Sequence, residues 1–119
     1  MRMMITNDSP IAIALHAGDI ADLPFEPFSG TTSFRQRMVW RDGEATAEIL
    51  AVDAGQRLGS HTHRTHHHHL WVIDGEVDVI GTRLCAGSYT HISAGVEHDL
   101  DASATYGCTV FYVYERSLL

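Results

Sequence analysis

Short runs of apolar residues, or of alternating apolar and polar residues, fill the chain from about residue 31 to residue 114. Examples are ATAEILAV, HLWVI, EVDVI and TVFYVY, and turns that contain glycine separate them, such as RDGE, DAGQ, IDGE and SAGV. Turns at intervals of about 8–12 residues, without a sustained helical period, are typical of an all-β sandwich or barrel. The pattern therefore predicts one all-β domain over residues 31–119.

Residues 1–30 differ from the rest of the chain. The segment IAIALHAGDIADL has an ambiguous period and fits either a short helix or an added edge strand. Pro24 and Pro27 then favour an extended backbone, because proline fixes its own φ and disfavours helix at the preceding residue. We expect residues 1–30 to form an N-terminal arm that packs on the barrel.

The last apolar run, TYGCTVFYVY, has apolar side chains on both faces. Strand alternation places Tyr106, Cys108, Val110, Tyr112 and Tyr114 on one face and the intervening side chains on the other. Strands of this kind are covered on both sides. We expect the cover to be the opposite sheet together with the arm, or a partner subunit.

Length and charge exclude several classes of protein. The 119 residues fit one domain. Eight arginines and no lysine stand against 15 acidic residues, so the net charge of −7 leaves no basic surface for nucleic acid. No run approaches the ~20 apolar residues of a membrane helix, and the first ten residues lack a signal-peptide core. Two cysteines are too few for a disulfide framework. We expect a cytoplasmic protein that binds neither nucleic acid nor membrane.

Histidine is the unusual residue: the chain has nine, and eight of them lie between His61 and His98. His61 and His63 are two residues apart, which places both side chains on one face of a strand. His68 begins the next apolar run, and His98 follows the turn SAGV. Imidazoles on neighbouring strands suit zinc, copper, iron or nickel. The spacing predicts one divalent transition-metal ion held by histidines.

The run from His66 to His69 leaves the register of the third ligand open. If alternation holds into the strand, His68 faces inward with Leu70 and Val72. A slip of one residue, or a bulge in the turn, would make His67 or His66 the ligand instead. The other histidines of the run are then rim residues, hydrogen-bonding partners of the ligands, proton shuttles or solvated loop residues.

Two stretches of the chain resemble the two motifs of the cupin superfamily. The first is Gly55-x5-His61-x-His63-x4-His68-x6-Gly75, and the second is Gly87-x5-Ser93-x-Gly95-x2-His98. The resemblance implies a cupin jelly roll, in which two antiparallel sheets form a small barrel with the metal inside its mouth. Carried over by position, the ligands of the family fall on His61, His63, His68 and His98.

The chain departs from the cupin pattern at three positions. His68 stands where the family usually has a Glu ligand, Ser93 where it has a turn proline, and Ala102 where it has a closing Asn. Four neutral ligands leave the full 2+ charge on the ion, which favours an anionic chelating substrate. The stretches DLPFEPFSG, MVWRDG and YGCTVFYV also resemble single-domain cupins that cleave acetylacetone or 2,4'-dihydroxyacetophenone, and the zinc-binding domains of certain anti-sigma factors.

Further residues are candidates for contact with a substrate. Tyr89 and His91 share a strand face, and both would orient a substrate if that face points into the barrel; otherwise His91 is a core histidine. Arg57 is at strand spacing from His61, so it either meets a carboxylate or enolate or lies on the surface. The apolar wall expected around the substrate includes Leu70, Val72 and Tyr112.

Three functions fit these residues. The first is a non-haem Fe(II) dioxygenase that cleaves a C–C bond in a small enolisable ketone, diketone or hydroxyketone, with O₂ as the second substrate. The second is a non-redox isomerase, cyclase or lyase that uses zinc or nickel. The third is a non-catalytic metal-binding sensory module. We expect the dioxygenase, as a homodimer with Fe(II) in preference to Mn, Ni, Zn or Cu.

Overall fold

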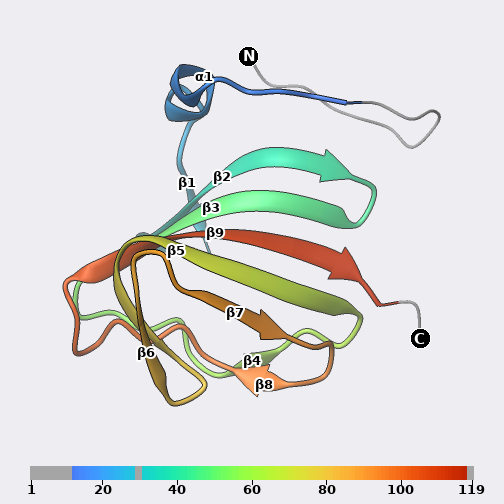
Figure 1. The fold of residues 1–119 in the computed structure, drawn as a ribbon. Helices are drawn as coiled ribbons and strands as arrows, with labels where there is room; N and C mark the ends of the chain where they lie inside the picture. The colour runs from blue at the N-terminus through green and yellow to red at the C-terminus, as the bar shows by residue number, and fades with distance from the viewer. Residues whose placement is uncertain (1–11, 29–30, 118–119) are drawn as a thin grey trace.

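The structure, a computed structural model, describes residues 12–28 and 31–117 and consists mainly of antiparallel strands (Figure 1). Its elements, in chain order, are α1 (Ala17–Ala21), β1 (Glu26–Phe28), β2 (Thr31–Asp42), β3 (Ala45–Asp53), β4 (His61–Thr62), β5 (His66–Val79), β6 (Thr82–Cys85), β7 (Tyr89–Ile92), β8 (Glu97–His98) and β9 (Gly107–Arg116).

Most strands belong to one large antiparallel sheet. Its order is β1-β2-β3-β9-β5-β6, and β7 also pairs with β5, while β4 and β8 form a separate pair. Figure 1 shows the sheet curving from β2 and β3 through β9 and β5 to β7, with the β4–β8 pair below. This confirms the predicted all-β fold of antiparallel sheets, and it agrees with a jelly roll. The described strands do not join into one continuous closed barrel.

The segment before the first long strand contains both a helix and an edge strand. His16 begins α1, because its Nδ1 accepts a hydrogen bond from the Gly18 N–H while the Asp19 carboxylate accepts one from the His16 N–H. β1 follows and pairs antiparallel with β2. Between α1 and β1, Leu23 is buried and its carbonyl accepts a hydrogen bond from Arg37. Residues 1–11 and 29–30 of the predicted arm lie outside the described residues.

The core lies on the concave face of the large sheet. Alternate residues of three neighbouring strands fill it, in rows that the strand register defines: Leu50, Val110 and Val72 form one row, and the next row contains Tyr112 and Leu70. Cys108, Val110 and Tyr112 therefore face inward, as the alternation predicts. Tyr106 does not follow the pattern, because it precedes β9 and is 95% exposed.

Two glycines let the strands pass close to one another where β5 bends. Gly75 has φ +78°, and a Cβ there would lie 2.1 Å from the carbonyl oxygen of Gly107. Gly107 has φ +92°, and a Cβ there would lie 2.6 Å from the carbonyl oxygen of Val52. Only glycine combines this conformation with this close contact. The bend separates the half of β5 that pairs with β7 from the half that pairs with β6.

The convex face is less completely covered. Phe111 and Val113 of β9 are half-buried, and Trp71 on β5 is 40% exposed. Among the described residues, no helix has the length and apolar character needed to span a membrane. Cys85 and Cys108 are both free thiols.

Candidate metal centre

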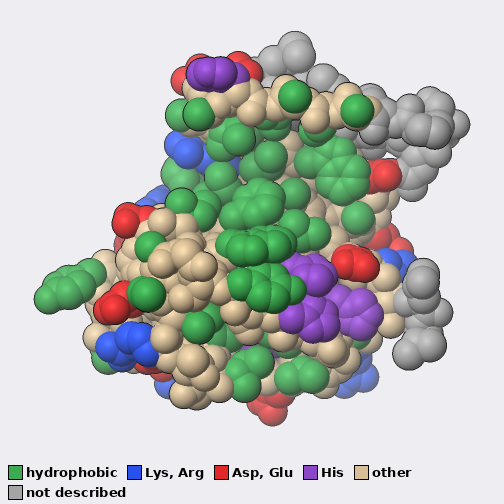
Figure 2. All heavy atoms as spheres, viewed as in Figure 1, with side chains coloured by type: hydrophobic (Ala, Val, Ile, Leu, Met, Phe, Trp, Pro, Cys, Tyr) green, Lys and Arg blue, Asp and Glu red, His purple; other side chains and the backbone are tan. Residues whose placement is uncertain are grey.

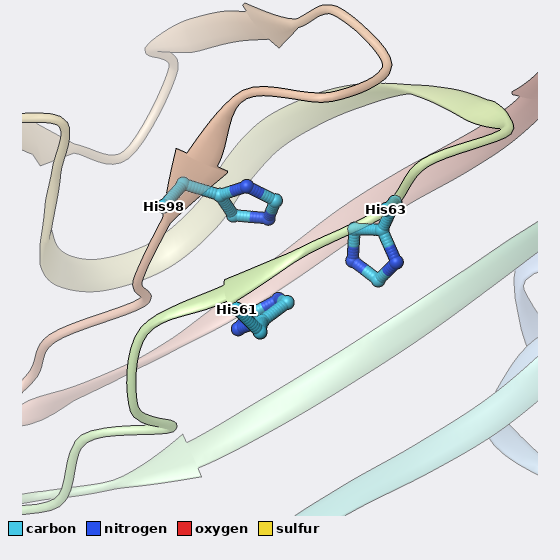
Figure 3. A group of neighbouring side chains, drawn as sticks. All are labelled: His61, His63 and His98. Carbon is cyan, nitrogen blue, oxygen red and sulfur yellow. The ribbon is translucent and has the colours of Figure 1, made fainter.

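Three of the predicted ligands meet at the β4–β8 pair. His61 on β4 lies directly opposite His98 on β8, and His63 follows β4 on the same side. One ligand atom of each lies within 4.8 Å of those of the other two. The ring centroid of His61 is 4.9 Å from that of His63 and 4.3 Å from that of His98. Figure 3 shows the three rings gathered in the space between these segments.

Backbone carbonyls orient two of these rings. Nδ1 of His61 lies 2.8 Å from the Gly59 carbonyl oxygen, and Nδ1 of His98 lies 3.0 Å from the Val96 carbonyl oxygen. A carbonyl only accepts, so each Nδ1 carries the proton and each Nε2 keeps its lone pair. This is the arrangement that metal-binding histidines usually have, with the second nitrogen held by a hydrogen bond. Nε2 of His98 is buried and has no hydrogen-bond partner among the described residues.

His68, the fourth predicted ligand, lies against this group. It faces inward with Leu70 and Val72, and is 5% exposed. Its ring centroid lies 4.8 Å from that of His63 and 5.6 Å from that of His98. Both of its ring nitrogens are buried without a hydrogen-bond partner among the described residues. The ligand atoms of His61, His63 and His98 form one compact group, and His68 lies next to this group. A bond from His68 to the ion therefore stays a prediction.

Burial disfavours the charged form of His63, His68 and His98. It lowers the pKa of His68 from 6.5 to about 2 and that of His63 to about 4, and the neighbouring histidines lower both further in the same direction. The pKa of His98 is also lowered, again mainly by burial. Neutral imidazoles with unused lone pairs are the form that binds transition metals, and burying them without partners is costly. The residues present therefore fit an ion of this class.

Tyr114 is a site residue that the spacing of the histidines does not reveal. Its hydroxyl lies 3.0 Å from Nε2 of His63, and its ring stacks on His68 at a centroid distance of 4.0 Å. Burial raises its pKa, so the hydroxyl stays protonated. The only signal in the sequence is that Tyr114 shares the inward face of the last strand with Tyr112. It positions two of the four histidines.

A buried carboxyl group lies one row deeper. Glu48 is 5% exposed, and its register partner is Tyr112, while Thr46 of the same strand pairs with Tyr114. The Thr46 hydroxyl donates a hydrogen bond of 2.9 Å to Glu48. Burial raises the pKa of Glu48, although hydrogen bonds from Thr46 and Tyr112 oppose this effect. The inner wall thus holds this carboxyl group next to the register row of Tyr112.

A small cavity of about 10 Å³ lies against the histidines. Its lining is mostly apolar and comprises Phe28, Leu50, Leu58, His61, His68, Leu70, Leu100, Tyr112 and Tyr114. Leu70 and Tyr112 thus lie beside the cluster. Val72 is buried in the core but is not part of this lining. The cavity has room for about one water molecule.

The structure corrects the expectation for Tyr89 and His91. Both are exposed, while Ile92 of the same strand is buried. The reason is the pairing with β5, where His91 lies opposite His69 and not opposite the buried His68. Tyr89 and His91 therefore lie on the convex face and cannot orient a substrate at the cluster.

Arg57 takes the second of its two expected positions, on the surface. Its guanidinium pairs with the Asp99 carboxylate, and its side chain is 58% exposed. It lines an open groove of about 610 Å³ together with Asp78 and Arg83, and not the cavity beside the histidines. The strand spacing from His61 fails because Gly59, with φ +94°, interrupts the extended backbone between them.

His67 does not take the place of His68. Its Nδ1 accepts a hydrogen bond of 3.0 Å from the Ala94 N–H, so the proton of the neutral ring is on Nε2. Such a ring offers no lone pair to an ion unless that hydrogen bond is lost. His66 is half-buried, and its Nδ1 lies 2.8 Å from the Thr65 hydroxyl.

Comparisons with known proteins identify one family and many solved structures with a similar fold. The sequence matches the profile of the ChrR cupin-like domain family over residues 14–117. No curated protein matches it. Among solved structures, it is similar to the polyketide cyclase RemF from Streptomyces resistomycificus (17% identity, 89% of this chain and 82% of that one, TM-score 0.72).

Two further structures are similar over most of their length. One is an RmlC-like cupin from Shewanella frigidimarina, with 22% identity over 82% of this chain and 87% of that one and a TM-score of 0.69. The other is the complex of Rhodobacter sphaeroides SigE with the anti-sigma ChrR, with 20% identity, coverage of 91% and 71%, and a TM-score of 0.68. At these identities the similarity establishes the fold.

Proposed function

Because the chain belongs to the ChrR cupin-like domain family, a cupin family, we propose that its histidine cluster is a transition-metal centre and that the chain is an enzyme. The proposed activity is that of a non-haem Fe(II) dioxygenase that cleaves a C–C bond in a small enolisable ketone, diketone or hydroxyketone. The observation that carries the proposal is the group of His61, His63 and His98 with His68 against it, in which both ring nitrogens of His68 and Nε2 of His98 are buried without a hydrogen-bond partner among the described residues.

The donor set favours an anionic ligand. His61, His63, His68 and His98 would hold the ion, and none of them carries a compensating negative charge. A bound Fe(II) ion would supply Lewis acidity toward an enolate and the redox chemistry that O₂ requires. An enolate with two oxygens matches the charge and would chelate. The substrate class therefore follows from ligands that leave the 2+ charge of the ion uncompensated.

The surrounding residues have separate tasks. The Tyr114 hydroxyl can accept a hydrogen bond from Nε2–H of His63, which leaves the Nδ1 lone pair for the ion, and its ring stacks on His68, so Tyr114 keeps both rings in place. Leu70, Leu100 and Tyr112 exclude water from the buried side. His61 and His63 are half-buried, whereas His68 and His98 are buried, so a substrate larger than water approaches from the His61–His63 side.

The proposed reaction balances without a reductant. For a 1,3-diketone, the bond between a carbonyl carbon and the central carbon breaks, and each of these two carbons gains one oxygen atom from O₂. The products are a carboxylic acid and a 2-oxoaldehyde. One O₂ is consumed for each diketone, and no protein nucleophile takes part.

Oxygen uptake tests this proposal. We expect the Fe(II)-loaded protein to consume one O₂ for each molecule of 2,4-pentanedione, used as a probe 1,3-diketone. The Zn(II)-loaded protein and Fe(II)-treated His98→Ala should consume none above the rate of free Fe(II). If the wild-type protein retains Fe(II) but gives no uptake with diketones or hydroxyketones, the dioxygenase proposal is wrong.

One observation supports a non-redox enzyme as a second candidate. Tyr112 lines the cavity beside the histidines and Glu48 is its register partner, and burial raises the pKa of each. Such groups suit proton transfer to an enolate, and the similar RemF structure is that of a polyketide cyclase. The Zn(II)-loaded protein would then accelerate exchange of the α-protons of the probe in D₂O, and Glu48→Gln would slow this exchange. An unchanged exchange rate in Glu48→Gln would contradict this candidate.

A further inference from the structure

A second group of possible ligands lies on the convex face of the sheet, on the other side of β5 from His68. His69 on β5 is the register partner of His91 on β7, and their ring centroids are 4.8 Å apart. Nε2 of His69 lies 2.9 Å from a carboxylate oxygen of Glu115 on β9. This centroid distance between His69 and His91 is similar to those of the buried cluster, where the His61 ring lies 4.9 Å from that of His63 and 4.3 Å from that of His98. Three neighbouring strands thus place an imidazole and a carboxylate in contact with His69.

The hydrogen bonds of His69 allow it to become a metal ligand. Its Nε2–H donates to the Glu115 carboxylate, which only accepts, and its Nδ1 lies 2.8 Å from the Tyr89 hydroxyl, which can donate or accept. If an ion takes the place of the Nε2 proton, Nδ1 can carry the proton and donate to Tyr89, as the second nitrogen of a ligating histidine usually does. His67 differs, because its Nδ1 accepts from the Ala94 N–H, which cannot accept in return.

We propose that His69, His91 and Glu115 form a second, solvent-facing site for a divalent transition-metal ion. Two imidazoles and one carboxylate suit zinc, nickel or copper, and the net charge of −7 attracts cations to the chain. The His69–Glu115 ion pair would be replaced by bonds from both groups to the ion. His91 completes the site by rotation of its exposed side chain, whose described ring contacts are with His67 and His69.

An aromatic row beside the site supplies a spectroscopic reporter. Tyr89, Trp71 and Phe111 are register partners across β7, β5 and β9. Figure 2 shows hydrophobic and histidine side chains next to one another on the surface. The Trp71 ring lies 6.2 Å from the His69 ring and 5.1 Å from the Tyr89 ring. Cu²⁺ bound to His69 should therefore quench the fluorescence of Trp71, one of two tryptophans in the chain.

The test is a titration of the whole protein with Cu²⁺, with millimolar glycine present to suppress binding to single histidines. We expect saturable quenching in the wild-type protein and at least tenfold weaker binding, by the quenching curve, in His91→Ala and in Glu115→Gln. Trp71→Phe should lose the quenching. His98→Ala, which removes a buried ligand, and His67→Ala, which removes a neighbouring histidine of the run, should both quench as the wild type does.

Three outcomes would overturn the proposal. Quenching in His91→Ala equal to that of the wild type would show that the ion does not use His91. Loss of quenching in His98→Ala would place the ion at the buried cluster, and loss in His67→Ala would place it on the histidine run. Because His91 and Glu115 are exposed, their substitution should leave the fold intact, and circular dichroism checks this.

Discussion

The metal-free protein should lose stability as the pH falls from 7 to 5, and His68 should be a main cause. Burial lowers the pKa of His68 from 6.5 to about 2. The unfolded chain therefore takes up a proton below pH 6.5 that the folded chain excludes. Unfolding becomes more favourable as the pH falls, so the stability that neutral His68 permits is fully present above pH 6.5 and is lost progressively below it.

The size of the effect follows from proton linkage. Between pH 7 and pH 5, a single histidine that titrates only in the unfolded state reduces the free energy of unfolding by about 2 kcal/mol. A domain of this size has a total of roughly 5–15 kcal/mol. His63, with a pKa lowered to about 4, acts in the same direction. The loss is therefore large enough to measure.

Urea unfolding of chelator-treated protein at pH 7 and at pH 5 measures this loss in the free energy of unfolding. His68→Leu removes the titrating group and leaves no unpaired polar atom, so its loss of stability between the two pH values should be smaller than that of the wild type by about 2 kcal/mol. The exposed His91→Gln serves as the control and should behave as the wild type. Acidic residues titrate in all three proteins and cancel. An equal loss in His68→Leu and the wild type would refute the reasoning.

Three other substitutions test particular contacts. Gly75→Ala should lower the free energy of unfolding by about 3 kcal/mol or more in urea, because a Cβ would lie 2.1 Å from a backbone oxygen; a normal midpoint would show that β5 and β9 do not pass so closely. Ile80→Asn should raise it by about 1 kcal/mol, because Ile80 is 55% exposed with φ +49°, a conformation that Asn tolerates better. Tyr114→Phe should weaken metal binding by about 10- to 100-fold in competition with a chelator, because His63 loses its hydrogen bond; unchanged affinity would exclude this positioning role.

Local periodicity was sufficient to predict the strands and the inward face of β5. Alternation along HLWV places His68 with Leu70 and Val72, and the structure buries all three. The histidine motifs likewise predicted that His61, His63 and His98 would come together. In the structure, an antiparallel pair brings His61 and His98 opposite one another although they are far apart in sequence.

Features that depend on which strand pairs with which could not be predicted in the same way. A period of two shows that Tyr89 and His91 share a face, but the face that points inward depends on the partner of β7. That partner is β5, in a register that sets His91 beside His69. Tyr114 was missed for the same reason, because its contact with His63 joins positions 51 residues apart. For Arg57, a glycine in the left-handed region broke the alternation.

The central claim is that His61, His63, His68 and His98 hold a transition-metal ion, and metal analysis tests it most directly. Untagged protein loaded with Fe(II), and in parallel with Zn(II), would be dialysed against a weak chelator before analysis of its metal content. We predict that His91→Ala, which lacks the proposed solvent-facing site, retains one ion per chain and that the double variant His91→Ala/His98→Ala retains none. Retention of one ion by the double variant would contradict the account, since the metal would then be held elsewhere.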